Sequence, residues 1–394
     1  MKTSLAGIRV IELSTMITGP LTGMMLADLG ADVIKVENPD GGDPFRSFRG
    51  GLYSPHYCAY NRNKRSIALD LRSDQGNAAL TRLIERSDVV LNNFRPGVLE
   101  RLGFGDEFLQ ETNPRIIRCS ISGFGSTGPY AERPAYDTVA QALSGMSSLF
   151  VDPHNPRISG PTIVDNATGL YACQAILAAL VERERTGKAR RIDVNMLDTA
   201  IAFMPDPFGY LTQMNVVSDL YLRARTSQSY AFRCADEKLI AIHLSSQEKF
   251  WLQFTEAIDR LDLLRDQRFS TRTLRIDNYD ALSSAVCETF LCHSREYWID
   301  RFSPKDVPFA PVYNVDEVMS DPQVQHLGSF FDLHHPTEGD LKAIRRPIWF
   351  DGSRSDQPTQ APPMLGEHTV DVLEELGLEV PTHHADANAT AAGA

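Results

Sequence analysis

Short β-rich runs alternate with apolar or amphipathic stretches through the first two hundred residues. Runs rich in Val, Ile and Leu predict strands, and a stretch of helical character follows most of them. The predicted strands are residues 8–13, 31–37, 66–71, 88–94 and 115–124. Strands that alternate with helices of 10–15 residues are typical of βαβ units. The pattern therefore predicts an α/β fold built on a parallel sheet that helices cover on both faces.

The longest charge-free stretch of helical character follows Asp165. Residues 166–181 carry no charge and place apolar side chains at helical spacing, namely Leu170, Cys173, Leu177 and Leu180. This spacing predicts a buried helix. A carboxylate at the start of such a helix needs compensation. Asp165 either caps the helix by accepting backbone N–H bonds, or is a nucleophile that the helix dipole keeps ionised.

The pattern changes in the second half of the chain. Residues 204–224 contain prolines and show no clear period, which indicates a crossing linker. Short strands and aromatic-bearing amphipathic helices follow, as expected for a smaller α+β domain. Residues 368–378 predict one last amphipathic helix, and the low-complexity tail 382–394 predicts disorder.

Composition restricts the possible functions. The 394 residues are 42% hydrophobic and 23% charged, with a formal net charge of −12, which argues against general nucleic-acid binding. We find no charge-free run long enough for a membrane span and no apolar signal-peptide core at the N-terminus. The six cysteines lack zinc-ligand spacing. We therefore expect a cytoplasmic protein with no membrane or nucleic-acid partner and no metal site.

One motif resembles a dinucleotide-binding unit. A strand, a glycine-containing turn, a helix and a second strand ending in Glu37 follow one another. The turn STMITGPLTG lacks the GxGxxG pattern that lets the backbone approach a pyrophosphate. This absence argues against a nicotinamide-dependent dehydrogenase.

Two basic segments flank predicted strands in this acidic chain. NRNKRS contains Arg62 and Lys64, and NNFRPGVLERLGF contains Arg95 and Arg101. Each could be a solvated charged turn. Because open α/β sheets bind ligands at strand ends, the two segments together suggest a phosphate-bearing ligand. Phe94 could pack on its adenine or belong to the core.

The glycine-rich loop SGFGSTGPYAERPAYD follows the strand at 115–124. It lacks the lysine and hydroxyl residue of a phosphate-binding P-loop. Tyr136, near its end, could donate a hydrogen bond to a reacting oxygen, or could be a buried tyrosine with a satisfied hydroxyl.

Long blocks of the chain resemble, in order and spacing, those of the family III CoA-transferases, which include formyl-CoA transferase and carnitine CoA-transferase. The blocks are LAGIRVIELSTMITGPLTGMMLADLGADVIKVENPDGGDPFR, YNRNKRSIALDL, NNFRPGVLERLGF, SGFGSTGPYAERPAYDTVAQALSG and GPTIVDNATGLYACQAILAALVERERTG. The ending PPMLGEHTVDVLEELGL is similar as well. The resemblance covers essentially the whole chain apart from the tail.

The resemblance implies roles for individual residues. The family's catalytic aspartate corresponds to Asp165. The residues that line its CoA site correspond to Asn93, Phe94, Arg101 and Lys64.

The resemblance also implies an architecture. We expect a Rossmann-like large domain formed by residues 1–224 and 325–394, with a smaller α+β domain, 225–324, inserted between them. Two such chains would interlock as linked rings in a homodimer.

Departures from the family pattern bear on the reaction. The related α-methylacyl-CoA racemases have a histidine where this chain has Tyr136. A tyrosine with an ordinary pKa of about 10 is a poor base near neutrality, which favours transfer. Ile17 replaces a glutamine of formyl-CoA transferase, and Asn38 replaces a frequent arginine. We therefore expect an acid larger or less polar than oxalate or formate.

The sequence thus predicts an enzyme that moves CoA from a donor acyl-CoA to an acceptor carboxylic acid. The expected intermediates are an aspartyl anhydride and an aspartyl-CoA thioester, with CoA a substrate and no permanently bound cofactor. An α-methylacyl-CoA racemase and a non-catalytic CoA-binding protein are the alternatives.

Overall fold

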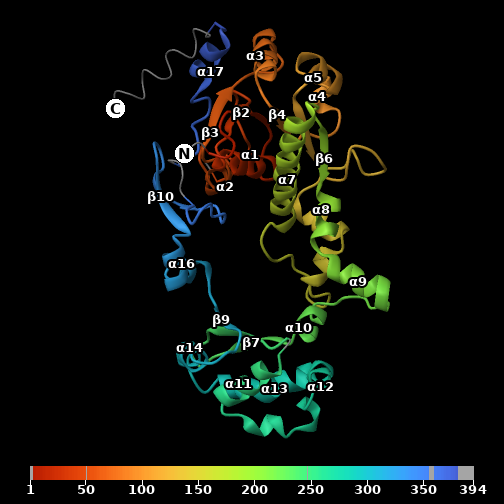
Figure 1. Cartoon of the computed structure of the whole chain (residues 1–394), viewed down its shortest axis with the longest axis vertical. Helices are drawn as coiled ribbons and strands as arrows, with labels where there is room; N and C mark the ends of the chain where they lie inside the picture. The colour runs from red at the N-terminus through yellow and green to blue at the C-terminus, as the bar shows by residue number, and fades with distance from the viewer. Residues whose placement is uncertain (1–2, 50, 246, 355–358, 380–394) are drawn as a thin grey trace. The chain divides into compact units, whose positions relative to one another are not determined.

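The computed structural model describes residues 3–49, 51–245, 247–354 and 359–379 (Figure 1). The described residues form two compact units. The first lies within Met1–Ser147, Ile158–Pro205 and Gly328–Ala394, and the second consists of Ser148–Arg157 and Asp206–Leu327. The assignment of 225–324 as an inserted domain stays a prediction, and the tail 382–394 lies outside the described residues.

A six-stranded sheet is the centre of the first unit, and every strand pairing in it is parallel. Its order is β3 (Lys64–Ala68), β2 (Asp32–Glu37), β1 (Arg9–Leu13), β4 (Val89–Asn92), β5 (Ile117–Ser122), β6 (Arg191–Asn195). This confirms the predicted α/β class with a Rossmann-like parallel sheet. The strand order reverses between β1 and β4, and ligands of open sheets bind beside the carboxyl ends at such a point.

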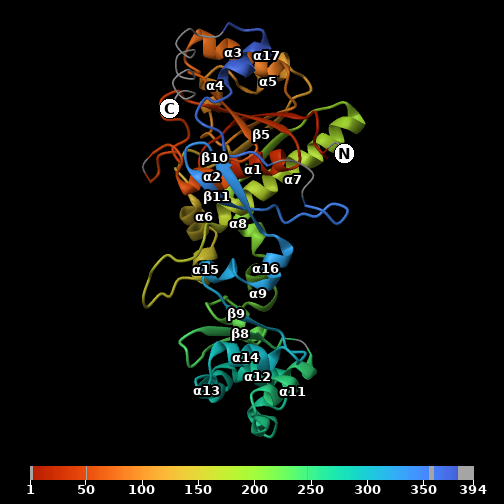
Figure 2. The same ribbon diagram turned by 90° about the vertical axis from the view of Figure 1, so that its left-hand side faces the viewer.

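Helices cover both faces of the sheet, as Figure 2 shows. On one face α3 (Asp74–Glu85), α5 (Asp106–Thr112) and α17 (Thr369–Leu376) share an apolar cluster with the strands. On the other face lie α1 (Thr18–Asp28) and α7 (Ile163–Thr186). Strands buried on both faces need continuous apolar runs, which explains why the sequence predicted five of the six; the partly exposed β6 was not among them.

Helices α1 and α7 approach closely at Gly169. A Cβ there would lie 3.0 Å from the Thr18 carbonyl oxygen, and the Thr22 hydroxyl donates to the Gly169 carbonyl at 3.1 Å. A side chain at this position would push the helices apart. Since Asp165 lies one turn earlier on α7, this contact fixes its place beside the start of α1.

By length and composition alone, α7 is the one described helix that could cross a membrane. Half of its most apolar window is buried, and the helix packs against α1, β5 and β6. This is the environment of a core helix.

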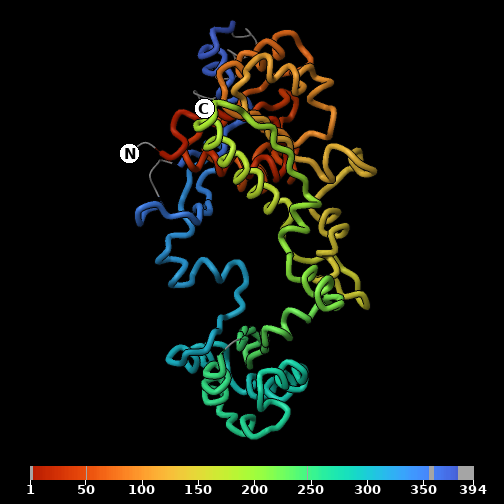
Figure 3. Tube along the Cα trace, turned by 45° about the vertical axis from the view of Figure 1, so that its right-hand side comes forward, coloured from red at the N-terminus to blue at the C-terminus, as the bar shows by residue number. Residues whose placement is uncertain are grey.

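The C-terminal segment returns to the edge of the sheet beside β3, where blue and red segments meet in Figure 3. His368 N–H donates to the Ser66 carbonyl at 2.9 Å, and Ala68 N–H donates to the Thr369 hydroxyl at 3.0 Å. These bonds satisfy the free edge of β3.

The second unit contains an antiparallel sheet of β7 (Ser229–Arg233), β8 (Leu239–His243) and β9 (Phe309–Val312). Helices α11 (Glu248–Ala257), α13 (Tyr279–Phe290) and α14 (Arg295–Phe302) pack on it through an aromatic core. The remaining helices and strands of both units are α2 (Pro55–Tyr60), α4 (Val98–Arg101), α6 (Asp137–Leu143), α8 (Met196–Phe203), α9 (Pro205–Met214), α10 (Leu222–Thr226), α12 (Arg272–Asp277), α15 (Val315–Val318), α16 (Pro322–Leu327), β10 (Phe330–His335) and β11 (Gly339–Ile344). Three short 3₁₀ turns complete them, Met146–Leu149, Leu261–Leu264 and Gln267–Phe269.

The prediction of an irregular linker over 204–224 was wrong, because α9 and α10 occupy most of it. Pro205 and Pro207 fall in the first turn of α9, where a missing N–H removes no helical hydrogen bond. The prolines therefore mark the start of a helix instead of preventing one.

Candidate active site

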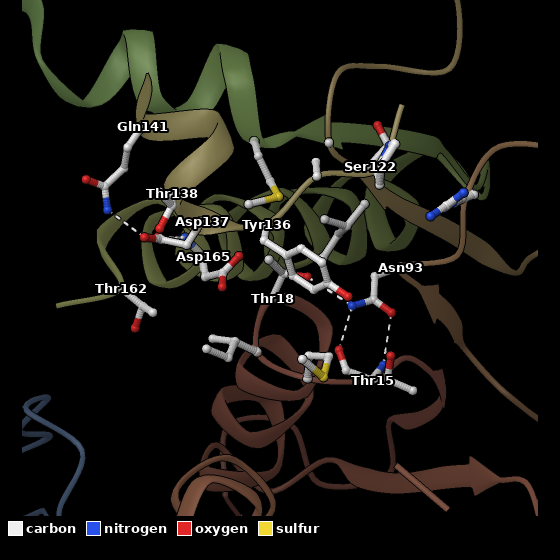
Figure 4. A pocket seen from close by; sticks show the side chains of 18 of the residues that line it. Thr15, Thr18, Asn93, Ser122, Tyr136, Asp137, Thr138, Gln141, Thr162 and Asp165 are labelled. Atoms are coloured by element: carbon white, nitrogen blue, oxygen red, sulfur yellow. Dashed lines mark hydrogen bonds between the residues drawn. The ribbon is translucent and has the colours of Figure 1, made fainter. Parts of the chain in front are cut away.

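A pocket of about 710 Å³ lies within the first unit, beside the carboxyl ends of the central strands (Figure 4). Loops after β1, β4 and β5 and the first turn of α7 line it. Five residues predicted from the sequence meet here: Asn93, Phe94, Arg95, Tyr136 and Asp165.

Asp165 is in the first turn of α7 but is not its cap. Thr162 is the N-cap residue, and its side chain makes no capping bond. The Asp137 carboxylate, from the start of α6, accepts the N–H groups of Val164 at 2.8 Å and Asp165 at 3.1 Å. The cap hypothesis for Asp165 was therefore wrong, and Asp137 performs that role from another helix. The only sign of Asp137 in the sequence was weak: it is an acid directly after Tyr136, at the end of the glycine-rich loop.

Electrostatics at Asp165 also differ from the expectation. Burial, and then the nearby charge of Asp137, raise the pKa of Asp165 to about 7. Among the described residues, no side chain donates a hydrogen bond to the Asp165 carboxylate. We expected the helix N-terminus to keep this group fully ionised, but Asp137 already occupies two of the N–H groups. Asp165 is thus a poorly solvated carboxylate that titrates near neutrality.

Tyr136 lies at the N-cap position of α6 and is 63% exposed. It is therefore not a buried core tyrosine. In Figure 4 its ring is drawn between Asp165 and Asn93, over the same pocket.

Asn93 holds the loop that follows β1. Its amide nitrogen donates to the Thr15 carbonyl at 2.7 Å and to the Thr18 hydroxyl at 3.1 Å, and its amide oxygen accepts Thr15 N–H at 3.0 Å. These dashed bonds are visible in Figure 4. One side chain thus joins the loops of β1 and β4, which meet at the switch point of the sheet.

Two of the predicted CoA contacts lie elsewhere. Lys64 is 1% exposed, and its ammonium lies 2.9 Å from the Glu12 carboxylate. Arg62 is mostly buried against Asp28. The Lys64 ammonium also donates to the Pro20 carbonyl at 2.8 Å and to the Asn61 side-chain oxygen at 2.8 Å, so all of its partners are protein groups. Their interpretation as phosphate contacts was wrong, since buried carboxylates already neutralise them.

A second cavity, of about 640 Å³, adjoins the first and shares Thr15 and Phe94 with it. It lies over the carboxyl ends of β1 to β4, and Arg72, four residues after the end of β3, is among its lining residues. Arg72 was not predicted as a binding residue, although it is a cation directly after the predicted strand 66–71. Arg101 is exposed on α4, between Val98 and Leu102, which also line this cavity.

Phe94 packs on the core cluster and also lines the two cavities, and its contact with an adenine stays a prediction. Across the described part of the chain, no group of three or more His, Cys, Asp or Glu side chains could hold a metal ion.

Comparisons with known proteins agree with this geometry. The model of CoA-transferase family III matches residues 5–369. The chain is 33% identical to human succinyl-CoA:glutarate CoA-transferase, over 94% of this chain and 86% of that protein. It is 34% identical to a succinate–glutarate CoA-transferase of Agrobacterium fabrum, over 95% and 96% of the two chains.

A more distant comparison gives the same family. Formyl-CoA:oxalate CoA-transferase of Escherichia coli O157:H7 is 31% identical over 96% of each chain. The crystal structure of a CAIB/BAIF family protein from Brucella suis has a TM-score of 0.83 and 32% identity, over 95% of this chain and all of that one. The sequence resemblance is confirmed, and the chain belongs to CoA-transferase family III.

Proposed function

We propose that this enzyme transfers CoA from an acyl-CoA thioester to a carboxylic acid, with Asp165 as the nucleophile. One observation carries the proposal: a half-buried carboxylate faces the pocket without a described side chain donating to it. A carboxylate that protein groups leave unpaired is available to attack a thioester carbonyl.

The proposed reaction begins when an Asp165 oxygen attacks the donor carbonyl. The C–S bond breaks, which leaves a mixed anhydride and CoA thiolate. The thiolate then attacks the aspartyl carbonyl, the anhydride C–O bond breaks, and the donor acid departs. The acceptor carboxylate attacks the resulting Asp165–CoA thioester, and the released thiolate takes the acceptor acyl group from the second anhydride. Charge and protons balance at every step, so no general base is required.

Tyr136 is the proposed donor to the oxyanion that forms in each tetrahedral step. Its exposed position at the pocket and its place at the N-cap of α6 support this role. Asp137, through its bonds to the first turn of α7, is proposed to orient Asp165.

We place CoA over the carboxyl ends of β1 to β4, in the 640 Å³ cavity that opens beside the pocket. The Asp165 pocket is lined by Asn93, Phe94 and Arg95. We propose that these residues contact CoA where its thioester meets the two acids. Arg72 and Arg101 are the cations proposed for the phosphate groups, in place of Arg62 and Lys64.

The acids are proposed to be short dicarboxylates, with succinyl-CoA as donor and glutarate as acceptor. The names of the human and Agrobacterium relatives suggest these substrates. The pocket supports them, because Ile17 and Phe48 supply apolar walls for a methylene chain and Arg133 supplies a cation for a second carboxylate.

Racemisation of an α-methylacyl-CoA is the second candidate. An Asp165 pKa of about 7 also suits a base that exchanges an α-proton. The transferase proposal predicts no incorporation of solvent deuterium at the α-carbon, whereas the racemase requires it.

A second copy of the chain is the proposed partner, interlocked as the family resemblance implies. Among the described residues of α9, none is buried, although the helix carries Phe208, Leu211 and Met214. An exposed apolar face of this kind is typical of an interface. The cytoplasm is the proposed location.

The test is transfer from succinyl-CoA to glutarate by the wild-type enzyme and by Asp165→Asn, in deuterated water. Asp266→Asn is a matched control, because Asp266 is paired with Arg268 on the surface. We expect transfer without deuterium, lost only in Asp165→Asn. Full transfer by Asp165→Asn would contradict the proposal, and deuterium at the α-carbon would favour the racemase.

A further inference from the structure

Four charged residues form an ion cluster inside the first unit, beneath the pocket. The Lys35 ammonium lies 3.0 Å from Glu12 and 2.9 Å from Asp43, and the Lys64 ammonium lies 2.9 Å from Glu12. The side chains of all four are fully buried. Two cations and two anions make the cluster neutral, which is the condition for keeping charges in a core.

The cluster is bonded to the loop after β1. Lys35 donates to the Ser14 carbonyl at 2.7 Å, and the Asp43 carboxylate accepts the Met16 N–H at 3.1 and 3.2 Å. Asn93 holds the neighbouring Thr15 by its N–H and its carbonyl. Thr15, Met16 and Ile17 all line the pocket. The ion cluster and Asn93 therefore hold the same pocket loop at consecutive residues.

Met16 has a backbone conformation that such a loop does not adopt freely. Its φ is +69°, in the left-handed region that residues with a side chain rarely occupy. A charge-assisted hydrogen bond from its N–H to Asp43 stabilises that conformation. The buried Lys35 ammonium in turn keeps the Asp43 carboxylate in place.

We propose that Asp43 is a positioning residue for the acyl pocket: held by Lys35, it keeps Met16 in the left-handed conformation and so fixes the wall opposite the nucleophile. The inference rests on the proposed function of the Asp165 pocket. Met16 lines the Asp165 pocket and Asp43 is not among the residues that line it, so we infer that its effect passes through Met16. None of the sequence motifs indicated this role, because the acid, the cation and the loop come from three separate segments.

Glycine at position 16 supplies the test, because glycine adopts positive φ at little cost. If Asp43 acts through the Met16 backbone, Asp43→Ala, which removes both acceptor oxygens, should lower kcat/KM for the acceptor acid by roughly tenfold, since small displacements at a reacting centre cost that much or more. In the Met16→Gly background the same substitution should cost less than about threefold, because the conformation no longer depends on the clamp.

The double-variant cycle separates this role from a merely structural one. An equal loss of kcat/KM in both backgrounds would overturn the inference, because Asp43 would then act independently of Met16. Should Asp43→Ala fail to fold, the variant with both substitutions is the decisive protein: it should be soluble and within about threefold of Met16→Gly. If it is also unfolded, Asp43 serves the fold alone and the inference fails. Failure of the proposed function is seen separately, as full transfer by Asp165→Asn in the wild-type background.

Discussion

Two groups of acidic side chains, fully buried in the core and half-buried in the pocket, differ most in the presence of a cation. In the core, Glu12 and Asp43 each lie within 3.0 Å of a lysine ammonium. Glu37, beside them, has a lowered pKa although burial raises it, because hydrogen bonds from Arg46 and the charge of Lys35 outweigh the burial. In the pocket, Asp165 faces Asp137 and pairs with no cation among the described residues; burial, and then the charge of Asp137, raise its pKa to about 7.

The difference explains why the core carboxylates are unreactive whereas the Asp165 carboxylate can react. A paired carboxylate has its lone pairs occupied and its charge compensated. An unpaired carboxylate is costly to bury, and forming a bond to carbon or hydrogen removes this cost because it neutralises the charge. The comparison predicts that the core acids determine stability, whereas Asp165 determines the reaction and even opposes stability.

The largest expected effect is on activity. Asp165→Asn should reduce kcat for CoA transfer by on the order of 10⁴-fold or more, because an amide cannot form the anhydride. Steady-state transfer assays measure it, and circular dichroism checks the fold. Residual activity within tenfold of wild type would contradict the claim that the unpaired Asp165 carboxylate is the reacting group.

The next effect is on stability. Glu12→Gln should lower the free energy of unfolding by about 3–5 kcal/mol, because it leaves buried ammonium groups without their shared anion. Urea denaturation measures this change. The control is Glu182→Gln, whose partner Arg190 is at the surface, where a far smaller change is expected. Similar changes in the two variants would show that the core cluster is not special.

Unlike Glu12, which stabilises the fold, the ionised Asp165 carboxylate should lower the free energy of unfolding at high pH. Its pKa of about 7 lies above the ordinary 3.8, so between these pH values the folded state binds more protons than the unfolded state. The free energy of unfolding therefore falls as pH rises through this window. Asp165→Asn removes the ionised carboxylate, and we expect the free energy of unfolding at pH 8 to increase by on the order of 2 kcal/mol. This is less than the full pKa shift implies, because solvent reaches the group. Little gain is expected at pH 4, and a loss of stability at pH 8 would contradict the account.

The smallest effect is a shift in a pH profile. Wild-type kcat/KM should rise with pH through about 7, since the carboxylate of Asp165 is the reactive form. Asp137→Asn removes the neighbouring charge while its side-chain oxygen still accepts the α7 N–H bonds. We expect this limb to move by roughly one unit to lower pH. If the rise of kcat/KM with pH does not move, or moves to higher pH, the charge of Asp137 does not contribute to the raised pKa of Asp165.

The sequence predicted the features that depend on local pattern. Apolar runs located the parallel strands, and the motif around Asp165 located the pocket that holds Tyr136, Asn93 and Phe94. Features that depend on distant partners were not predictable. The pKa of Asp165 depends on its burial and then on Asp137, both of which come from segments distant in sequence. Lys64 resembled a surface cation because its partner Glu12 is on another strand.

The most direct test of the central claim is mass spectrometry of the enzyme after incubation with succinyl-CoA and trapping with hydroxylamine or borohydride. We expect the peptide that contains Asp165 to carry the hydroxamate or the reduction product, and Asp137 to remain unmodified. An unmodified Asp165 in an enzyme that retains full transfer activity would contradict the account.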